Sequence, residues 1–341
     1  MKRKVFGMVS EKDLTIFHDT SKRIFSELAK DVVGHEDVIN HVAIAMIAGG
    51  NVLLEGVPGI GKTRMVRSIG RVFGLPFSRI QFTPDLMPAD VTGTNILEKT
   101  PDGKTVSKFQ PGPIFSSIVL ADEINRATPK TQSALLEAME EHRVSVAGRD
   151  YQLEEPFFVL ATQNPIEQEG TYTLPEAQID RFMMKLNLAY PSVEQLCDII
   201  EMTQITRQET ASQVLDAPTL LRMRETAAGI PVIRDVVRYA MRLVSATHAD
   251  SEVGGETAKK YLRLGASPRA GQALITAAKV RALLDGRYNV SYEDINTLAY
   301  PVLRHRIRLN IDALAEHRSE DELIAAIIRE QGGKKPHPGK R

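Results

Sequence analysis

The stretch GVPGIGKT, Gly56–Thr63, matches the P-loop pattern at every specified position. Its glycines let backbone N–H groups wrap phosphate oxygens, the amine of Lys62 can reach the β- and γ-phosphates, and the hydroxyl of Thr63 can bind Mg²⁺. An apolar run over 52–54 precedes the stretch and a helical pattern over 64–73 follows it, which is the context that a P-loop requires. These flanks disfavour the alternative, a glycine-rich turn that binds nothing.

Two carboxylates follow a second apolar run. Residues 118–121 read as a buried strand, and Asp122 and Glu123 come directly after it. An aspartate at the carboxyl end of a strand suits Mg²⁺, and the adjacent glutamate suits polarisation of an attacking water. Alone, the pattern also fits an ordinary strand with an acidic turn; behind a P-loop, we favour the catalytic interpretation.

Three further residues have roles that the pattern leaves open. Asn164 follows the run 158–161 and can hold the attacking water or the γ-phosphate, or bond its own loop backbone. Arg269 lies in the first turn of a helix capped by Ser267, where a cation opposes the helix dipole by about 0.3–1 kcal/mol. A nearby anion such as a nucleotide phosphate would explain why Arg269 stands at this position. The alternative is an arginine exposed to solvent. Arg181 is equally ambiguous when taken alone. It could be an arginine finger, which stabilises charge on the transferred phosphoryl group and can act from a neighbouring subunit.

The first two thirds of the chain alternates apolar runs with helical patterns, which indicates a parallel α/β sheet. We expect a helix over 129–142 after the N-cap Thr128. Segments 94–111 and 143–153 predict two β-hairpins inserted between core strands. The expected core strands are 52–54, 77–82, 118–121, 157–161 and 182–188.

After Pro191 the pattern becomes helical, with no strand expected before Gln331. Helix starts are predicted at Ser192, Ser267 and Ser291. The end of the chain is rich in Gly, Pro and Lys and is expected to be disordered. We therefore divide the chain into an N-terminal helical segment, an α/β nucleotide-binding core, a helical C-terminal lid and a tail, at residues 1–30, 31–190, 191–331 and 332–341.

Composition excludes several classes of protein. The 341 residues carry 43 basic and 43 acidic side chains, and this balance argues against a general polyanion binder. The single cysteine, Cys197, excludes an internal disulfide framework and fits a reducing compartment. No apolar run approaches the roughly 20 residues of a membrane span, so we expect a cytoplasmic protein.

Two other patterns favour ordinary structural roles. His35 and His41 lack the spacing of a zinc-binding helix, so we expect them to be surface or core histidines. The basic run 304–308 could contact nucleic acid, although a solvated helix face fits it better. The chain has no tryptophan and 6% aromatic residues, so it offers no evident platform for stacking bases.

With these motifs the chain resembles the AAA+ ATPases and, among them, the MoxR family. The motifs that carry the resemblance are GVPGIGKT (56–63), LADEINRA (120–127), ATQNP (161–165), EQEGTYTLPEAQIDRF (167–182), GASPRA (265–270) and PVLRHRI (301–307). The resemblance implies an AAA+ core with a parallel five-stranded sheet, followed by an all-helical lid. The hairpins correspond to the helix-2 insert and the pre-sensor-1 hairpin, on the pore side of a ring.

The resemblance also assigns residues to roles. It implies that Lys62 and Thr63 belong to Walker A, Asp122 and Glu123 to Walker B, Asn164 to sensor 1, Arg181 to the arginine finger and Arg269 to sensor 2. Arg126, next to the Walker B pair, is our second candidate for the finger. The expected ATP-binding residues are Gly56, Pro58, Gly59, Ile60, Gly61, Lys62, Thr63, Arg64 and Asp122, with Thr63 and Asp122 on Mg²⁺. The segment 32–35, VVGH, is similar to a VVGQ stretch near the adenine, with His35 where glutamine is usual.

As a whole, the resemblance implies a hexameric Mg²⁺-ATPase that remodels or matures protein complexes, with a von Willebrand factor A domain protein as a frequent partner. Lid and core would grip the nucleotide from two sides, so that hydrolysis changes their angle. The alternatives are a scaffold that binds ATP without turnover, a motor acting on nucleic acid and a small-molecule kinase. Glu123, Asn164 and Arg181 argue against the scaffold, the zero net charge against the motor, and the size of the helical domain against the kinase.

Overall fold

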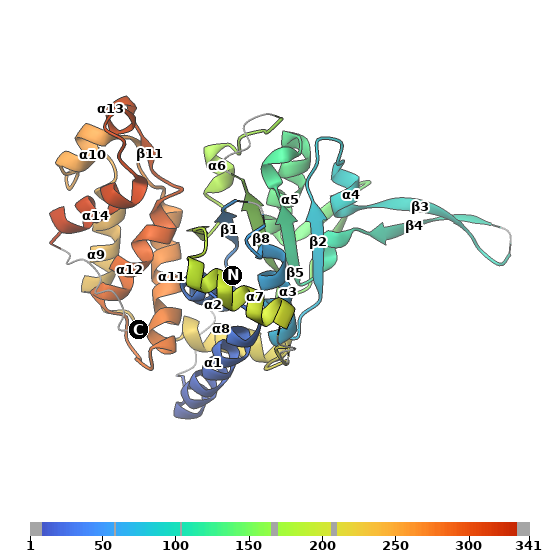
Figure 1. Cartoon of the computed structure of the whole chain (residues 1–341). Coiled ribbons are helices and arrows are strands. Elements are labelled where there is room, and N and C mark those ends of the chain that lie inside the picture. The colour runs from blue at the N-terminus through green and yellow to red at the C-terminus, as the bar shows by residue number, and fades with distance from the viewer. Residues whose placement is uncertain (1–8, 58, 103, 165–169, 206–209, 333–341) are drawn as a thin grey trace.

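The computed structural model describes residues 9–57, 59–102, 104–164, 170–205 and 210–332. At its centre is a five-stranded sheet in the order β2-β5-β8-β1-β9, and all of its paired neighbours are parallel (Figure 1). The strands are β1 Val52–Glu55, β2 Phe77–Gln81, β5 Ile118–Asp122, β8 Phe158–Gln163 and β9 Met184–Asn187. The predicted α/β core with five parallel strands is confirmed.

The central strands are apolar on both faces because each face packs against its own hydrophobic core. Val119 and Ala161 belong to the core around α5, whereas Leu120 and Leu160 belong to the core around α1, α2 and α3. The helical elements of this half are α1 Glu11–Asp31, α2 Glu36–Ala48, α3 Lys62–Val72, α4 Pro88–Thr92, η1 Pro113–Phe115, η2 Ile124–Arg126, α5 Pro129–Glu141 and α6 Glu176–Ile179. Thr128 is the N-cap of α5, as the sequence predicts.

Both predicted hairpins are present. They are β3 Gly93–Lys99 with β4 Thr105–Pro111, and β6 Arg143–Val146 with β7 Arg149–Gln152. The first extends from the core as a long arm (Figure 1). At its base the ring of Phe109 stacks on Tyr151 of the second hairpin, with ring centroids 3.9 Å apart. The two insertions therefore contact each other although the α5 helix separates them in sequence.

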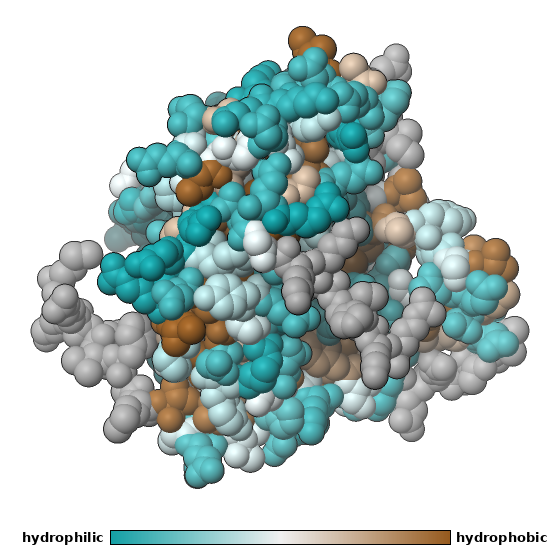
Figure 2. All heavy atoms as spheres, turned by 90° about the vertical axis from the view of Figure 1, so that its left-hand side faces the viewer, coloured by the Kyte–Doolittle hydropathy of each residue, from teal (hydrophilic) through white to brown (hydrophobic). Residues whose placement is uncertain are grey.

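The C-terminal part is mainly helical. Its helices are α7 Val193–Ile200, η3 Glu201–Ile205, α8 Ala217–Ala228, α9 Arg234–Ser245, α10 Glu256–Tyr261, α11 Pro268–Leu284, α12 Tyr292–Leu303, α13 Ile311–Ala315 and α14 Glu320–Glu330. Ser192, Ser267 and Ser291 cap α7, α11 and α12 as predicted. The surface of the lid seen in Figure 2 is mostly hydrophilic, with hydrophobic side chains in small separate groups.

Two expectations for this part are wrong. A short antiparallel pair, β10 Leu262–Leu264 and β11 Arg308–Leu309, lies within it, and strands this short leave no detectable alternation in the sequence. The basic run 304–308 is not a solvated helix face, because His305 and Arg306 are buried against the core. Their burial depends on partners far away in the chain.

Helix α1 contacts both the α/β core and the C-terminal helical part. Helix α1 packs against α3 of the core and also against α8 and α11 of the C-terminal part, so it joins the two parts. The expected disordered tail lies outside the described residues, except for Gly332. Within the described part of the chain, no helix is long and apolar enough to cross a membrane.

The lid contains a buried carboxylate between arginines. Asp294 of α12 is fully buried and accepts hydrogen bonds from Arg287 at 2.5 and 2.8 Å, as well as from Arg281 and Ser291. Burial raises the pKa of this carboxyl, but the bonds from Arg287 and Ser291 lower it by more, so its pKa lies below the ordinary value.

We expect Asp294→Asn to lower the free energy of unfolding at neutral pH by about 3–5 kcal/mol, because the arginines lose their buried anion. The contribution is present above the unfolded-state pKa of about 3.9 and is lost as the pH falls through the lower, folded-state pKa. Denaturant unfolding followed by circular dichroism at neutral and acid pH measures the difference between the two proteins. A difference that stays constant into strong acid would contradict the ion-pair account.

Candidate nucleotide site

Polar residues meet where three neighbouring strands end. Strand β1 leads into the P-loop and pairs with β8, which ends just before Asn164; β8 in turn pairs with β5, which ends at Asp122. Because all three strands are parallel, their carboxyl ends lie at one edge of the sheet. The N–H of Gly56 donates to the carbonyl of Gln163 at 3.3 Å, which joins the start of the P-loop to the segment that carries Asn164.

The P-loop backbone has the conformation that its glycines permit. Gly59 and Gly61 have φ of 84° and 81°, in the left-handed region that side chains disfavour. No atom lies within 4 Å of where a Cβ would stand at either position, so the backbone conformation rather than crowding requires glycine here. Helix α3 begins directly after Gly61, and its first N–H groups have no partner within the helix, which is the arrangement that binds phosphate. Pro58 lies outside the described residues.

Lys62 lies among carboxylates at the base of this loop. Its Nζ donates to the carbonyl oxygen of Gly56. Burial lowers the pKa of the Lys62 amine, while the nearby charges of Asp122, Glu123 and Glu55 act in the opposite direction. The structure thus brings the predicted P-loop lysine within electrostatic reach of both predicted Walker B carboxylates.

A buried threonine holds the two carboxylates in place. Thr162 of β8 donates to Asp122 Oδ1 at 2.7 Å, and its hydroxyl accepts the backbone N–H of Glu123 at 2.8 Å. Glu123 has φ 57°, a strained conformation for a glutamate that its surroundings must maintain. Its Oε2 accepts from Gln81 at 2.8 Å and from Arg126 at 3.3 Å. Three hydrogen bonds therefore hold Glu123, one at its backbone N–H and two at its carboxylate.

The donor set fits a magnesium–nucleotide complex. Asp122 contributes carboxylate oxygens and Thr63, in the first turn of α3, a hydroxyl, and these hard oxygen ligands suit Mg²⁺. Arg79 of β2 contacts Asp122 Oδ2 through two nitrogens, at 2.6 and 3.1 Å. Arg79 is thus a counter-charge for Asp122, and Mg²⁺ would have to share this oxygen with the guanidinium or displace it.

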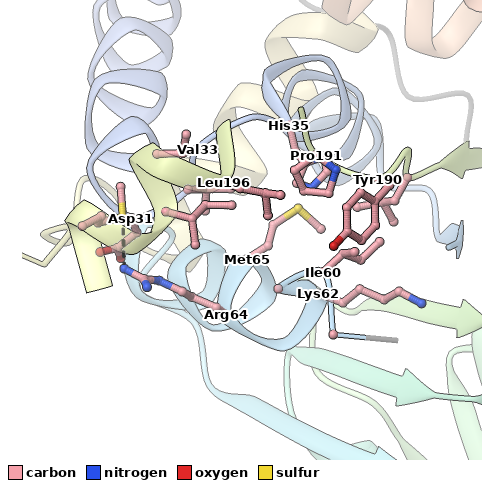
Figure 3. A pocket seen from close by; sticks show the side chains of 16 residues that line it. Asp31, Val33, His35, Ile60, Lys62, Arg64, Met65, Tyr190, Pro191 and Leu196 are labelled. Atoms are coloured by element: carbon pink, nitrogen blue, oxygen red, sulfur yellow. Dashed lines mark hydrogen bonds between the residues drawn. The ribbon is translucent and has the colours of Figure 1, made fainter. Parts of the chain in front are cut away.

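A pocket of about 500 Å³ opens beside the P-loop. Figure 3 shows the pocket between Met65 of α3 and Leu196 of α7, with Asp31 toward one end and Tyr190 toward the other. Its size and apolar lining suit the base and sugar of a nucleotide. Arg64 lines it too and reaches Met202 Sδ at 3.2 Å.

His35 lies in the wall of this pocket, consistent with the similarity of 32–35 to a stretch near the adenine, and burial lowers the pKa of its ring. Helix α7 contributes Leu196 and Ile199, whereas Cys197 between them is exposed. No described lining residue comes from beyond Met202, so the rest of the predicted lid does not line this pocket.

Arg181 and Arg269 lie together at a different place. Both contact Glu140 of α5, at 2.8 Å from Arg181 and 2.5 Å from Arg269, on opposite carboxylate oxygens. They line a second cavity, of about 300 Å³, between core and lid. Arg269 is therefore not among the described residues that line the P-loop pocket, and carboxylates of the protein compensate the cation at the start of α11. Asp180 is the second of these, 3.8 Å from Arg269.

Sequence reasoning missed Thr162, Arg79 and Gln81. The available signal was weak: Arg79 and Gln81 alternate at the end of β2, and Thr162 is a polar residue in an otherwise apolar strand. Only the order of the strands reveals that all three face Asp122 and Glu123.

Comparison with known proteins is consistent with this geometry. Residues 51–184 match the family model described as "ATPase family associated with various cellular activities (AAA)", and residues 255–327 match the AAA lid domain. The chain is 43% identical to "Chaperone MoxR1" of Mycobacterium tuberculosis over 91% of this chain and 81% of that protein. It is 33% identical to "Protein MoxR" of Methylorubrum extorquens, over 92% and 95% of the two chains. The crystal structure of a "putative ATPase" from Cytophaga hutchinsonii superposes with a TM-score of 0.87 at 40% identity, covering 94% of this chain and 96% of that one.

We expect Lys62→Ala to abolish ATP binding, because the phosphates lose their main cationic partner while α3 remains packed against α1. Anisotropy of a fluorescent ATP analogue measures binding. Lys108→Ala, on the exposed β4 hairpin strand, is the matched control and should bind normally. ATP binding and turnover at wild-type levels by Lys62→Ala would remove the P-loop assignment.

Proposed function

The chain belongs to the MoxR family of AAA+ ATPases, and from this premise we propose that it binds Mg²⁺-ATP, hydrolyses it and uses the cycle to remodel protein complexes. The observation that carries the proposal is the convergence of Lys62, Asp122 and Glu123 at the carboxyl ends of β1 and β5. A phosphate cradle, a metal-binding carboxylate and a candidate base adjoin there. These are the groups that hydrolysis of a nucleoside triphosphate needs.

Binding divides between two kinds of surface. The backbone N–H groups at the start of α3 and the amine of Lys62 hold the phosphates, and the apolar wall formed by Met65 and Leu196 holds the base. Thr63 and Asp122 hold Mg²⁺, which when bound neutralises charge on the β- and γ-phosphates. His35, beside the same wall, offers ring nitrogens to the edge of the base.

Hydrolysis requires a water that is aligned with the γ-phosphate. In this proposal a carboxylate oxygen of Glu123 accepts the proton of that water as it attacks, and Asn164 orients the water or the phosphate. Thr162 and Gln81 restrict the backbone and side chain of Glu123, so the base has little freedom to search for its position. This restriction lowers the entropic cost of reaching the reactive arrangement.

We expect Glu123→Gln to bind ATP as the wild type does, since Asp122 still holds the ion. Turnover should fall by about 10²–10⁴-fold, because an amide cannot accept the proton from water. Phosphate release measures turnover, and anisotropy measures binding. If Glu123→Gln instead lost binding while Asp122→Asn kept it, the two roles would be reversed.

Arg181 and Arg269 support action between subunits. Both contact Glu140 and line a cavity apart from the P-loop pocket of their own chain. A nucleotide that they contact would therefore be one bound by a neighbouring subunit. We propose a homo-oligomeric, hexameric ring in which Arg181 approaches the γ-phosphate held by the neighbour's P-loop. Arg126 is the second candidate for the finger, although it contacts Glu123 of its own chain.

We expect Arg181→Ala to bind ATP normally and to turn over at least about 10³-fold more slowly, the scale of an arginine finger. Mixing inactive Arg181→Ala with inactive Lys62→Ala should restore activity, because some interfaces of mixed rings combine an intact pocket with an intact finger. An ATPase assay over a series of mixing ratios, with co-assembly confirmed by mass, is the measurement. If no ratio recovers activity in mixed rings, the trans role of Arg181 fails.

Two observations support the remodelling role: the name of one relative and an exposed hairpin arm. One relative is named a chaperone, and the two hairpins joined by Phe109 and Tyr151 offer an arm for contact with a client protein. Leu97 near the end of that arm is 77% exposed. A protein client, with a von Willebrand factor A domain protein as partner, fits the zero net charge better than nucleic acid does. Nucleic-acid binding that falls steeply with salt in a filter assay would favour the motor instead.

A further inference from the structure

Arg306, just after α12, is the most completely bonded arginine of the contact between lid and core. Its side chain is 2% exposed. Its Nε donates to Asp180 Oδ1, and its terminal nitrogens donate to the carbonyl oxygens of residues 180, 182, 183 and 302, over distances of 2.5–3.1 Å. An arginine side chain has five N–H groups, so each of them has an acceptor here.

The main acceptor of Arg306 is the residue next to Arg181. Asp180 Oδ1 accepts from Arg306 at 2.7 Å, and Oδ2 accepts from the hydroxyl of Ser267 at 2.7 Å. Ser267 is the N-cap of α11, whereas Arg306 follows α12. Two separate parts of the lid therefore hold one carboxylate of the core.

Neighbouring residues hold the same segment. The buried ring of His305 bonds the carbonyl oxygen of Phe182 through Nε2 at 3.0 Å, and Arg304 donates to the carbonyl oxygen of Lys185 at 3.1 Å. Burial lowers the pKa of His305 well below its ordinary value. Its Nε2 is the donor in this bond, because a carbonyl oxygen can only accept. The lid thus contacts the backbone on both sides of Phe182.

We propose that Arg306 is a positioning residue for Arg181: it holds the backbone of 180–183 so that the guanidinium of Arg181 is presented to the neighbouring subunit. This inference rests on the trans role proposed above. The Arg181 side chain has its own contacts, to Glu140 and to the carbonyl oxygen of Leu136 at 2.8 Å. Those contacts fix the tip of the side chain, and Arg306 fixes the backbone from which it starts.

The buried pair of Arg306 and Asp180 is better explained by a role in positioning the backbone than by a gain in stability. A buried ion pair adds little net stability over apolar side chains of similar volume, because desolvating the two charges offsets their attraction. A planar guanidinium with all N–H groups bonded does restrict the geometry of the groups around it, and lysine, with three donors on a flexible stem, cannot reproduce this.

The first test compares Arg306→Met with Arg308→Met. Arg308 lies two residues further along the chain and contacts Glu176 at the surface. Its variant therefore controls for the loss of one positive charge in this part of the lid. Arg306→Met should bind ATP normally, because no residue of 304–306 is among the described residues lining the P-loop pocket. Its turnover in assembled rings should fall about 100-fold, as misplacing a catalytic group by an ångström does, while Arg308→Met keeps wild-type turnover.

Mixing inactive variants then distinguishes a positioning role of Arg306 from misfolding of the Arg306→Met subunit. Arg306→Met mixed with Lys62→Ala should regain activity, because the first subunit supplies an intact pocket and the second an intact finger. Arg306→Met mixed with Arg181→Ala should not, because neither subunit supplies a working finger. A misfolded subunit would fail in both mixtures.

The double variant Asp180→Asn/Arg306→Met removes both charges and guards against unfolding caused by an unpaired buried carboxylate. It should behave as Arg306→Met does in both mixtures. The proposal is overturned if Arg306→Met rings keep wild-type turnover, if their mixture with Lys62→Ala stays inactive, or if neither variant assembles. The Arg181→Ala and Lys62→Ala mixture tests the underlying trans role separately: if it fails, the proposed function fails first.

Discussion

Parallel pairing of β5, β8 and β1 is the constraint on which the candidate nucleotide site depends. The P-loop, the carboxylates Asp122 and Glu123, and Asn164 come from segments far apart in the chain, and only the shared direction of their strands brings them to one edge. Thr162 shows how closely the sheet and the site are linked. It is fully buried between β1 and β5, and its hydroxyl donates to Asp122 and accepts from the backbone N–H of Glu123.

Electrostatics explains why the predicted arginines gather away from the pocket. A cation in the first turn of α11 opposes the helix dipole, and the sequence analysis sought its partner in a phosphate. The structure instead provides Glu140 and Asp180, carboxylates of the core that also contact Arg181 and Arg306. Core and lid are therefore joined by alternating charges, and this contact fixes their relative placement within one chain.

The sequence was sufficient for features that depend on local pattern. Strands buried on both faces give apolar runs, the αL positions at Gly59 and Gly61 give a recognisable motif, and serine caps mark helix starts. It was insufficient where a residue's environment comes from a distant segment. Arg306 lies 126 residues from Asp180, and from the sequence alone its basic neighbourhood suggested solvent. Arg79 and Gln81 likewise become site residues only through the pairing of β2 with β5.

The position of Cys197 has a practical consequence for experiments on this molecule. The chain contains one cysteine, and its thiol is exposed on α7, next to Leu196 in the wall of the P-loop pocket. A maleimide fluorophore or a nitroxide spin label would attach at this single site in the natural sequence, with no need to remove other thiols. Emission or line shape from that label would report whether the surroundings of α7 change when nucleotide is added.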